Sequence, residues 1–483
     1  MSQTLIEIKN VIPSMDFLVF STPINWNIKK DQHWAVIGPN GAGKTLLTDI
    51  LSGKHAIKSG EIICKDELGN PQSIRKCIKF VAFRDIYSLT DIQNGYYQQR
   101  WNIGLEEEVA TVKDFLDKEP EQDWIHYLIS VFGIEDLIEK KINLLSSGEL
   151  RKFLIVRSLS AKPRILVLDN PFIGLDANSR NVLREVLKRL AQMENLQIIL
   201  VVSDIADISP VITHVLPIKD KTLLPALYYS DFLSDRGLHK KLFKSKIEPR
   251  YLSDIQGKKE KISFKNALSF KNVTIKYGTR TILKNLSWQV KRGEKWALSG
   301  PNGSGKSTLL SLVVADNPQA YANDITLFDR KRGTGESIWD IKKHTGYISP
   351  EMHLYYQKNV SCLDIVGSGF FDTIGLYKKC NKEQEIIALK WMKIFGIEKI
   401  KDTSFLNIST GEQRLILLAR VFVKDPELLI LDEPLHGLDM ENKRQVKKII
   451  ERFCTPDKAL IYVTHYQEEI PDVVNQYLTL EKL

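Results

Sequence analysis

The stretch from Gly300 to Ser307 holds three glycines, a lysine and a serine in the spacing of a phosphate-binding loop, G-x-x-x-x-G-K-S. The glycines let consecutive backbone N–H groups curve around a polyphosphate without Cβ clashes. Lys306 places a positive charge on the β- and γ-phosphates, and the Ser307 hydroxyl is a ligand for Mg²⁺. A predicted strand at 295–299 precedes the loop, and a predicted helix follows it with its positive end toward the anion. The predicted nucleotide contacts are Gly300, Asn302, Gly303, Gly305, Lys306, Ser307 and Thr308.

The first half of the chain repeats this loop at 38–45. Lys44 and Lys306 lie 262 positions apart, and Trp34 and Trp296 repeat at the same distance. The chain is therefore a tandem duplication with two predicted nucleotide sites. The contacts predicted in the first site are Gly38, Asn40, Gly41, Gly43, Lys44 and Thr45, with Thr45 as a Mg²⁺ ligand.

Carboxylates end apolar strands in both halves. Asp432 follows four apolar residues and Asp169 does the same in the first half, so each is predicted to hold Mg²⁺ at the carboxyl edge of a sheet. Glu433 comes directly after Asp432. A carboxylate in that place can orient the attacking water and accept its proton, which makes Glu433 the predicted catalytic base.

Two further residues have a functional and a structural interpretation. His465 ends another apolar strand and can hydrogen-bond a γ-phosphate, whereas a lone histidine at a strand end is usually structural. Tyr277 precedes the second loop and could stack on adenine, whereas an aromatic residue there is more often part of the core. We predict a catalytic role for His465 and a nucleotide contact for Tyr277.

Each half also contains a Ser-x-Gly-Glu pattern before a predicted amphipathic helix. One copy alone is weak, because many helices start with such a cap. The two copies, each followed by an apolar strand and an aspartate, predict a helix start that closes over a phosphate held elsewhere. The residues are Ser146, Gly148, Glu149, Ser409, Gly411 and Glu412.

The composition is that of a globular protein of two or three domains, with 483 residues of which 43% are hydrophobic and 26% charged. No apolar run approaches the roughly 18 residues of a membrane-spanning helix, and the first residues lack a signal pattern. Five scattered cysteines predict reduced thiols in a cytoplasmic protein, without a disulfide or zinc site. The net charge is +9, and 238–265 holds nine basic against three acidic residues.

Strands that alternate with helices predict an α/β fold with a largely parallel sheet in each half. The expected domains are 1–224 and 263–483, joined by a basic linker at 225–262. The linker either touches nucleic acid or lipid or is only solvated. In the first half we expect an edge strand at 5–9, helices at 123–133 and 177–193, and strands at 165–169 and 197–202.

These motifs together resemble the ATP-binding cassette superfamily over nearly the whole chain, including D-loops at 174–176 and 437–439. The resemblance implies two P-loop NTPase domains that form a head-to-tail pseudo-dimer within a monomer and bind Mg²⁺ and ATP. Each ATP would lie between the phosphate loop of one domain and the Ser-x-Gly-Glu helix of the other. Segments 317–328 and 335–344 resemble more narrowly the tandem-cassette proteins associated with molybdate transport.

The first half departs from the family pattern at its catalytic positions. Asn170 stands where the second half has Glu433, Asp204 stands at the place of His465, and Met15 at the place of Tyr277. Because an asparagine cannot accept a proton, we expect the first site to bind ATP and hydrolyse it poorly. The family's Q-loop glutamine is also not evident. Residues 80–84 and 347–351 stand near its expected place in the two halves, and Glu351 is a different ligand from glutamine.

Three functions fit these observations. The first is an ATPase subunit that drives or regulates a membrane permease, for an oxyanion such as molybdate, at the inner face of the cell membrane. The second is a non-transport cassette protein that acts on ribosomes or RNA, which the basic linker favours and the family resemblance disfavours. The third is a nucleotide-occupied regulatory scaffold, which the incomplete first site favours.

Overall fold

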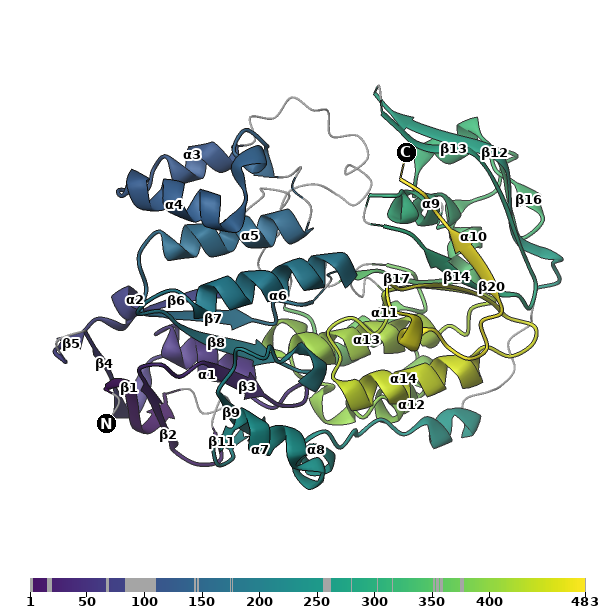
Figure 1. Cartoon of the computed structure of the whole chain (residues 1–483). Coiled ribbons are helices and arrows are strands. Elements are labelled where there is room, and N and C mark those ends of the chain that lie inside the picture. Colours follow the sequence, from purple (N-terminus) through teal and green to yellow (C-terminus); the bar gives the residue numbers. More distant parts are fainter. Residues whose placement is uncertain are drawn as a thin grey trace. The chain divides into compact units, whose positions relative to one another are not determined.

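The computed structural model describes residues 3–14, 20–66, 69–82, 110–142, 145, 147–173, 175, 177–254, 262–278, 280–301, 303–314, 316–350, 352, 356, 359–373 and 378–482. Among them, residues up to Lys244 form one compact unit and residues from Ser245 form a second, and each unit carries one phosphate loop (Figure 1). Within these ranges no helix has the length and apolar character needed to cross a membrane.

The first unit contains an antiparallel sheet in the order β2-β1-β4-β5 and a larger sheet in the order β10-β9-β3-β8-β7-β6, with β11 also paired to β9. In the larger sheet, β9, β3, β8, β7 and β6 are parallel, which confirms the predicted α/β fold. The strands are β1 (Thr4–Pro13), β2 (Ile24–Lys29), β3 (Trp34–Ile37), β4 (Ile57–Lys65), β5 (Pro71–Gln72), β6 (Ile78–Ala82), β7 (Ile165–Asp169), β8 (Gln197–Val202), β9 (His214–Lys219), β10 (Thr222–Leu223) and β11 (Leu227–Tyr228). The helices are α1 (Lys44–Leu51), α2 (Ile74–Cys77), α3 (Val112–Leu116), α4 (Gln122–Phe132), α5 (Ser147–Leu159), α6 (Ala177–Ala191), α7 (Tyr229–Ser234) and α8 (Arg236–Leu242), with 3₁₀ turns η4 (Glu135–Leu137) and η6 (Ile205–Asp207).

Both faces of the larger sheet are buried, because alternate residues of each strand enter two different cores. On β7, Leu166 and Leu168 join a core that includes α4, α5 and α6. Ile165 and Val167 point the other way, into a core shared with α1 and the antiparallel sheet. Figure 1 shows α6 along one side of β7 and β8 and α1 on the other. Charged side chains of this sheet can therefore reach solvent or a ligand only at the ends of its strands.

The second unit repeats this plan with an antiparallel sheet in the order β13-β12-β15-β16 and a parallel sheet in the order β17-β18-β19-β14-β20. The strands are β12 (Asn266–Tyr277), β13 (Arg280–Lys291), β14 (Lys295–Ser299), β15 (Asp324–Leu327), β16 (Arg330–Lys331), β17 (Thr345–Ile348), β18 (Leu428–Asp432), β19 (Ala459–Val463) and β20 (Gln476–Thr479). The helices are α9 (Lys306–Val313), α10 (Ile338–His344), α11 (Cys362–Ser368), α12 (Lys382–Ile394), α13 (Thr410–Phe422) and α14 (Met440–Phe453). The 3₁₀ turns are η7 (Pro249–Asp254), η8 (Pro318–Ala322), η10 (Glu398–Ile400), η11 (Phe405–Asn407) and η12 (Gln467–Glu469).

The parallel sheet of the second unit is also covered on both faces. On β18, Leu429 and Leu431 pack with helices α11 to α14, whereas Leu428 and Ile430 pack with α9 and the antiparallel sheet. The apolar runs that the sequence analysis assigned to strands are thus buried on both sides, as expected for parallel strands.

Two expectations about the first unit differ from the structure. The strand predicted at an edge, residues 5–9, is the inner strand β1, which pairs with β2 on one side and β4 on the other. Its alternating pattern arises because one face of the small sheet packs on a core and the other is solvated. Residues 57–82, where no strand was expected, contain β4, β5 and β6, because strands this short and polar leave no clear alternation in the sequence.

The predicted basic linker at 225–262 contributes to the cores of both units. Phe232, Leu242 and Phe243 are buried in the first unit. Ile247 and Leu252 are buried in the second unit, where η7 packs against α12 and α14. Apolar residues spaced among the lysines thus anchor the stretch, although its net charge suggested a solvated segment.

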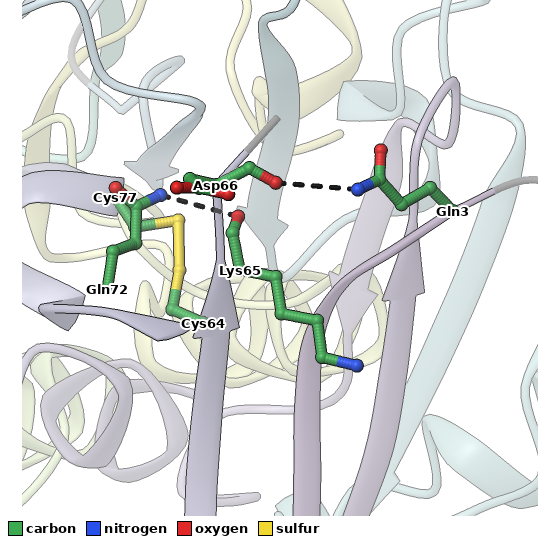
Figure 2. The surroundings of a disulfide bond; sticks show 6 residues. All are labelled: Gln3, Cys64, Lys65, Asp66, Gln72 and Cys77. Carbon is green, nitrogen blue, oxygen red and sulfur yellow. Dashed lines mark hydrogen bonds between the residues drawn. A yellow bond between two sulfur atoms is a disulfide. The ribbon is translucent and has the colours of Figure 1, made fainter. Parts of the chain in front are cut away.

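The expectation of reduced thiols throughout is wrong for one pair of cysteines. Cys64, near the end of β4, and Cys77, at the end of α2, form a disulfide with their Cα atoms 6.7 Å apart (Figure 2). Both are buried in the core beside α1. The β4–β5 hairpin brings them together, and neither the number nor the spacing of cysteines in a sequence reveals such a pairing. Cys362, Cys380 and Cys454 are free thiols.

We predict that the denatured, non-reduced protein contains three reactive thiols and the reduced protein five, as measured with a chromogenic thiol reagent. The variant Cys64→Ser should contain four under both conditions, because Cys77 then has no partner. Five reactive thiols in the non-reduced wild type would contradict the disulfide.

A second prediction concerns Gly396, which has φ +66° and whose Cβ, if present, would lie 2.4 Å from the carbonyl oxygen of Lys246. Alanine there combines left-handed backbone strain of about 1–2 kcal/mol with a clash against the backbone of Lys246. Gly278 has φ +57° and open space around its Cβ position, so Gly278→Ala is the matched control. By differential scanning calorimetry, Gly396→Ala should lower Tm by several degrees more than the control; equal shifts would refute the clash.

Candidate nucleotide-binding sites

The predicted site residues of the second unit lie at one edge of its parallel sheet. Strand β14 leads into the phosphate loop, β18 ends at Asp432, and β19 leads to His465. In the pairing register Leu298 lies opposite Val463, and Val463 lies opposite Asp432. The three carboxyl ends are therefore adjacent, which is where such sheets bind ligands. The first unit repeats this arrangement with β3, β8 and β7.

The loop of the second unit wraps tightly because its first glycine passes close to the last strand. A Cβ on Gly300 would lie 2.5 Å from the carbonyl oxygen of Leu480, so no larger residue fits. The Lys306 ammonium donates to the carbonyls of Gly300 (2.7 Å) and Pro301 (3.0 Å). These bonds hold a compact positive charge against the inside of the loop, at the start of α9.

The loop of the first unit has the same geometry. A Cβ on Gly38 would lie 2.1 Å from the carbonyl oxygen of Ile218, and Lys44 donates to the carbonyls of Gly38 (2.7 Å) and Pro39 (2.9 Å). In both loops the glycine before the lysine, Gly43 or Gly305, is in the left-handed region. Both loops are therefore shaped alike for phosphate binding.

Magnesium would be held by a hydroxyl and a carboxylate in each unit. Asp432 and Asp169 are nearly buried at their strand ends, and Ser307 and Thr45 stand in the first turns of α9 and α1. A hydroxyl and one carboxylate suit Mg²⁺, which keeps several positions for water and phosphate. Within the described residues no group of three or more His, Cys, Asp or Glu could cage a metal by itself, so this donor set fits an ion that arrives with a nucleotide.

Glu433 is held in a fixed position beside His465. Its backbone is left-handed (φ 46°), and its N–H donates to the carbonyl of Val463 at 2.9 Å. His465 Nε2 lies 3.2 Å from Glu433 Oε1. The structure thus joins the two residues that the sequence analysis predicted as catalytic, although they lie in separate loops.

The charge of Glu433 is set by its neighbours. Burial raises its pKa, but the hydrogen bond from His465 and the positive charges of His436, His465 and Arg414 outweigh burial and bring the pKa to about 2. The carboxylate is therefore ionised at neutral pH. An ionised, oriented carboxylate at this edge can align a water molecule and accept a proton from it.

The first unit offers different chemistry on the same backbone. Asn170 is also left-handed (φ 50°), and its N–H donates to the carbonyl of Val201 at 2.8 Å. Its side-chain amide donates to Asp169 Oδ1 at 2.7 Å. Asp204, at the place of His465, caps η6 by accepting from the N–H of Ala206 at 3.0 Å. Asn170 cannot accept a proton and the Asp204 carboxylate is turned to the start of η6, so the predicted catalytic pair of the second unit has no counterpart here.

The Ser-x-Gly-Glu segment of the second unit forms the start of α13, and the described residues of the first segment, from Ser147 on, form the start of α5. Ser409 and Glu412 make a reciprocal capping box: the N–H of Glu412 donates to the Ser409 hydroxyl at 3.3 Å, and the N–H of Ser409 donates to Glu412 Oε2 at 2.9 Å. Gly411 is buried behind them. In α5, Gly148 and Glu149 lie in the first turn, and Glu149 pairs with Lys140 at 2.9 Å. The helix-start part of the prediction is confirmed, whereas phosphate binding there stays a prediction.

Sequence reasoning missed Arg414, which lies on α13. Its guanidinium donates to the carbonyls of Ser349 (2.7 Å), Asp432 (2.9 Å) and Pro434 (3.0 Å). Arg151 on α5 stands at the matching place and donates to the carbonyl of Ile173. An arginine follows both Ser-x-Gly-Glu patterns at the same spacing, and this repetition was a signal in the sequence. Each arginine ties the start of its helix to the loop after the aspartate that is predicted to hold Mg²⁺.

The remaining predicted contacts have mixed outcomes. The Tyr277 hydroxyl accepts a hydrogen bond from Asn317 at 2.9 Å, and burial raises its pKa. Tyr277 thus has a structural role, and adenine stacking stays a prediction. Thr308 is buried in α9, and Asn40, Gly41 and Gly303 lie within their loops. Several predicted positions lie outside the described residues: Met15, Phe83, Arg84, Ser146, Gly174, Asp176, Asn302 and Glu351.

Comparisons with known proteins match both units. The family model described as ABC transporter matches residues 21–173 and 283–436. The chain is 35% identical to the ABC transporter ATP-binding protein ModF of Escherichia coli, over 92% of this chain and 90% of that protein. It is 28% identical to an uncharacterized ABC transporter ATP-binding protein of Schizosaccharomyces pombe, over 94% and 93%. The resemblance drawn from the motifs is thereby confirmed.

A solved structure is similar in fold over nearly the whole length. It is the crystal structure of the complex of archaeal ribosomal stalk protein aP1 and archaeal ribosome recycling factor aABCE1. The TM-score is 0.52 at 17% identity, over 97% of this chain and 87% of that one. At this identity the likeness concerns the fold alone.

The difference between the two units yields a paired test. Glu433→Gln keeps the size of the side chain but removes the base, so kcat for ATP hydrolysis should fall by about 10²-fold or more. Asn170→Ala removes an amide that cannot act as a base. Because the large loss of rate comes from losing general-base assistance, kcat of this variant should stay within about threefold of wild type. Phosphate release in steady state measures both. If Asn170→Ala abolishes hydrolysis while Glu433→Gln retains it, the active unit is assigned backwards.

Proposed function

The chain belongs to the ABC transporter family and is an ATPase, and from this premise we propose that it is the ATP-binding subunit that energises or regulates a membrane transporter. The observation that carries this proposal is the whole-length similarity to the ABC transporter ATP-binding protein ModF. An oxyanion such as molybdate is the solute we propose, on the strength of segments 317–328 and 335–344. Localisation at the inner face of the cell membrane belongs to the same proposal.

We also propose that the two units bind two Mg·ATP head-to-tail, each between one phosphate loop and the other unit's Ser-x-Gly-Glu helix. In this arrangement Lys306, Asp432 and Glu433 work with the segment at 146–149. Lys44 and Asp169 work with the segment at 409–412. The ATP at Lys306 is hydrolysed, because Glu433 supplies the base there. The ATP at Lys44 is retained longer and holds the pair together.

During hydrolysis the residues of the second unit have distinct tasks. The backbone N–H groups of the phosphate loop and the Lys306 ammonium stabilise negative charge that develops on the transferred phosphoryl group. The ionised Glu433 orients the attacking water and accepts its proton. His465 keeps the Glu433 carboxylate in place through their 3.2 Å contact. Bound Mg²⁺ supplies further charge neutralisation.

A second candidate function is action on ribosomes or RNA. The observation that favours it is the excess of basic residues at 238–265, because positive charge attracts nucleic acid. Arg250 in this stretch is engaged with Glu248 at 2.6 Å, and its guanidinium lies 5.0 Å from the centre of the Tyr251 ring. Part of the charge is thereby neutralised within the chain, so we rank this function second.

The test uses the Glu433→Gln variant, which should retain ATP. Tagged protein expressed in cells is fractionated into membranes and ribosomes with ATP present, and the doubly changed Lys306→Ala/Glu433→Gln variant is the control. We expect ATP-dependent enrichment in the membrane fraction and recovery of a multi-span membrane protein with the tag. ATP-dependent co-sedimentation with ribosomes, absent from membranes, would replace the transport proposal with the second candidate.

A further inference from the structure

The stretch that joins the two units is attached to the second unit immediately after it leaves the first. Phe243 is buried in the core of the first unit and Ile247 in the core of the second. Only three residues, Lys244, Ser245 and Lys246, separate these two buried side chains, so the chain between them spans at most about 14 Å. We call residues 245–254 the docked connector.

Several contacts fix the docked connector on α12 and α14. The N–H of Glu248 donates to the carbonyl of Ile394, at the end of α12, at 2.8 Å. Leu252 is buried among the same helices. Lys393 holds its ammonium 4.9 Å from the centre of the Tyr251 ring. The absence of a side chain at Gly396 lets the backbone of the connector pass close by, as described above.

One further contact links the docked connector, through Asn442 on α14, to the loop that carries Glu433. The Ser245 hydroxyl donates to Asn442 Oδ1 at 2.7 Å. Asn442 in turn donates to both carboxylate oxygens of Asp439, from its backbone N–H and from its amide, each at 2.9 Å. Asp439 is 1% exposed and caps the start of α14. Asn442 is therefore held on one side by the connector and on the other by the cap of α14.

Asp439 ends the short loop that begins at Glu433. Within this loop the N–H of His436 donates to the carbonyl of Glu433 at 3.0 Å, and the N–H of Leu438 donates to the carbonyl of Leu435 at 3.2 Å. Leu435 and Leu438 are both nearly fully buried. The loop is thus closed by its own hydrogen bonds and fastened at both ends. We therefore expect a displacement of the far end of this loop to be passed on to Glu433.

We propose that Ser245 and Asn442 are positioning residues for ATP hydrolysis, through which the docked connector fixes the far end of the Glu433 loop. Loss of the Ser245–Asn442 bond then alters the alignment of the Glu433 carboxylate. The connector docks on the unit that carries the glutamate, so the control acts on the hydrolytic site. This inference rests on the proposed role of Glu433.

The test compares Ser245→Ala with Ser245→Thr, which keeps the hydroxyl. Misplacement of a catalytic group by about 1 Å can cost up to about 10²-fold in rate. A partial shift in Ser245→Ala should therefore lower kcat by about three- to tenfold, with KM for ATP within about twofold of wild type. Ser245→Thr should restore kcat to within about twofold. Ser234→Ala is the matched control, because that hydroxyl donates only within its own helix end, to the carbonyl of Asp231.

A double-substitution cycle with Asn442→Ala strengthens the test. If the two residues act as one path, the double variant should be no slower than Asn442→Ala alone. An unchanged kcat in Ser245→Ala, with Glu433→Gln inactive, would overturn the positioning role and leave the proposed catalytic site intact. A lower Tm with unchanged kcat would assign Ser245 to stability and would also overturn it. An active Glu433→Gln variant would overturn the catalytic assignment and this inference together.

Discussion

The parallel pairing of β14, β19 and β18 is the constraint on which the rest of the second unit depends. It places three carboxyl ends side by side, so that the phosphate loop, Asp432 and the turn that carries His465 meet at one edge. Both faces of this sheet are covered by apolar cores, and a charged group buried there without a partner would be costly. The polar machinery is therefore confined to the edge. The helices and the small antiparallel sheet cover the faces and keep the sheet dry.

Duplication makes the chain its own comparison. Asn170 and Glu433 have the same left-handed backbone and the same N–H bond to the neighbouring strand, at 2.8 and 2.9 Å. The architecture is equal in the two units, and the side chain decides the chemistry. The side-chain amide of Asn170 donates a hydrogen bond to the Asp169 carboxylate, which attracts an N–H donor. The carboxylate of Glu433 would be repelled by Asp432 and turns to His465 instead. Replacing one functional group thus redirects the side chain as well as removing the predicted base.

Much of the site could be predicted from the sequence because its signals are local. The phosphate loops, the aspartates at strand ends and the capping Ser-x-Gly-Glu segments each lie within about eight residues, where residue type and spacing carry the physics. The contacts of Arg414 could not be predicted, since its partners lie 18 to 65 positions away. The Cys64–Cys77 disulfide was missed for the same reason: it depends on how β4 and β5 fold back. The inner position of β1 likewise depends on β4, which polar residues concealed.

The docked connector shows how composition can hide a mechanical role. Its lysines suggest a solvated segment, yet Ile247 and Leu252 are buried and Ser245 is bonded to the helix that follows the catalytic loop. Two sites are coupled only if a physical element between them has arrangements that each site favours differently. A long solvated tether cannot do this, because it transmits no force. A segment anchored by buried side chains and by the Ser245–Asn442 bond can, since any shift of it must be taken up by that bond or by α14.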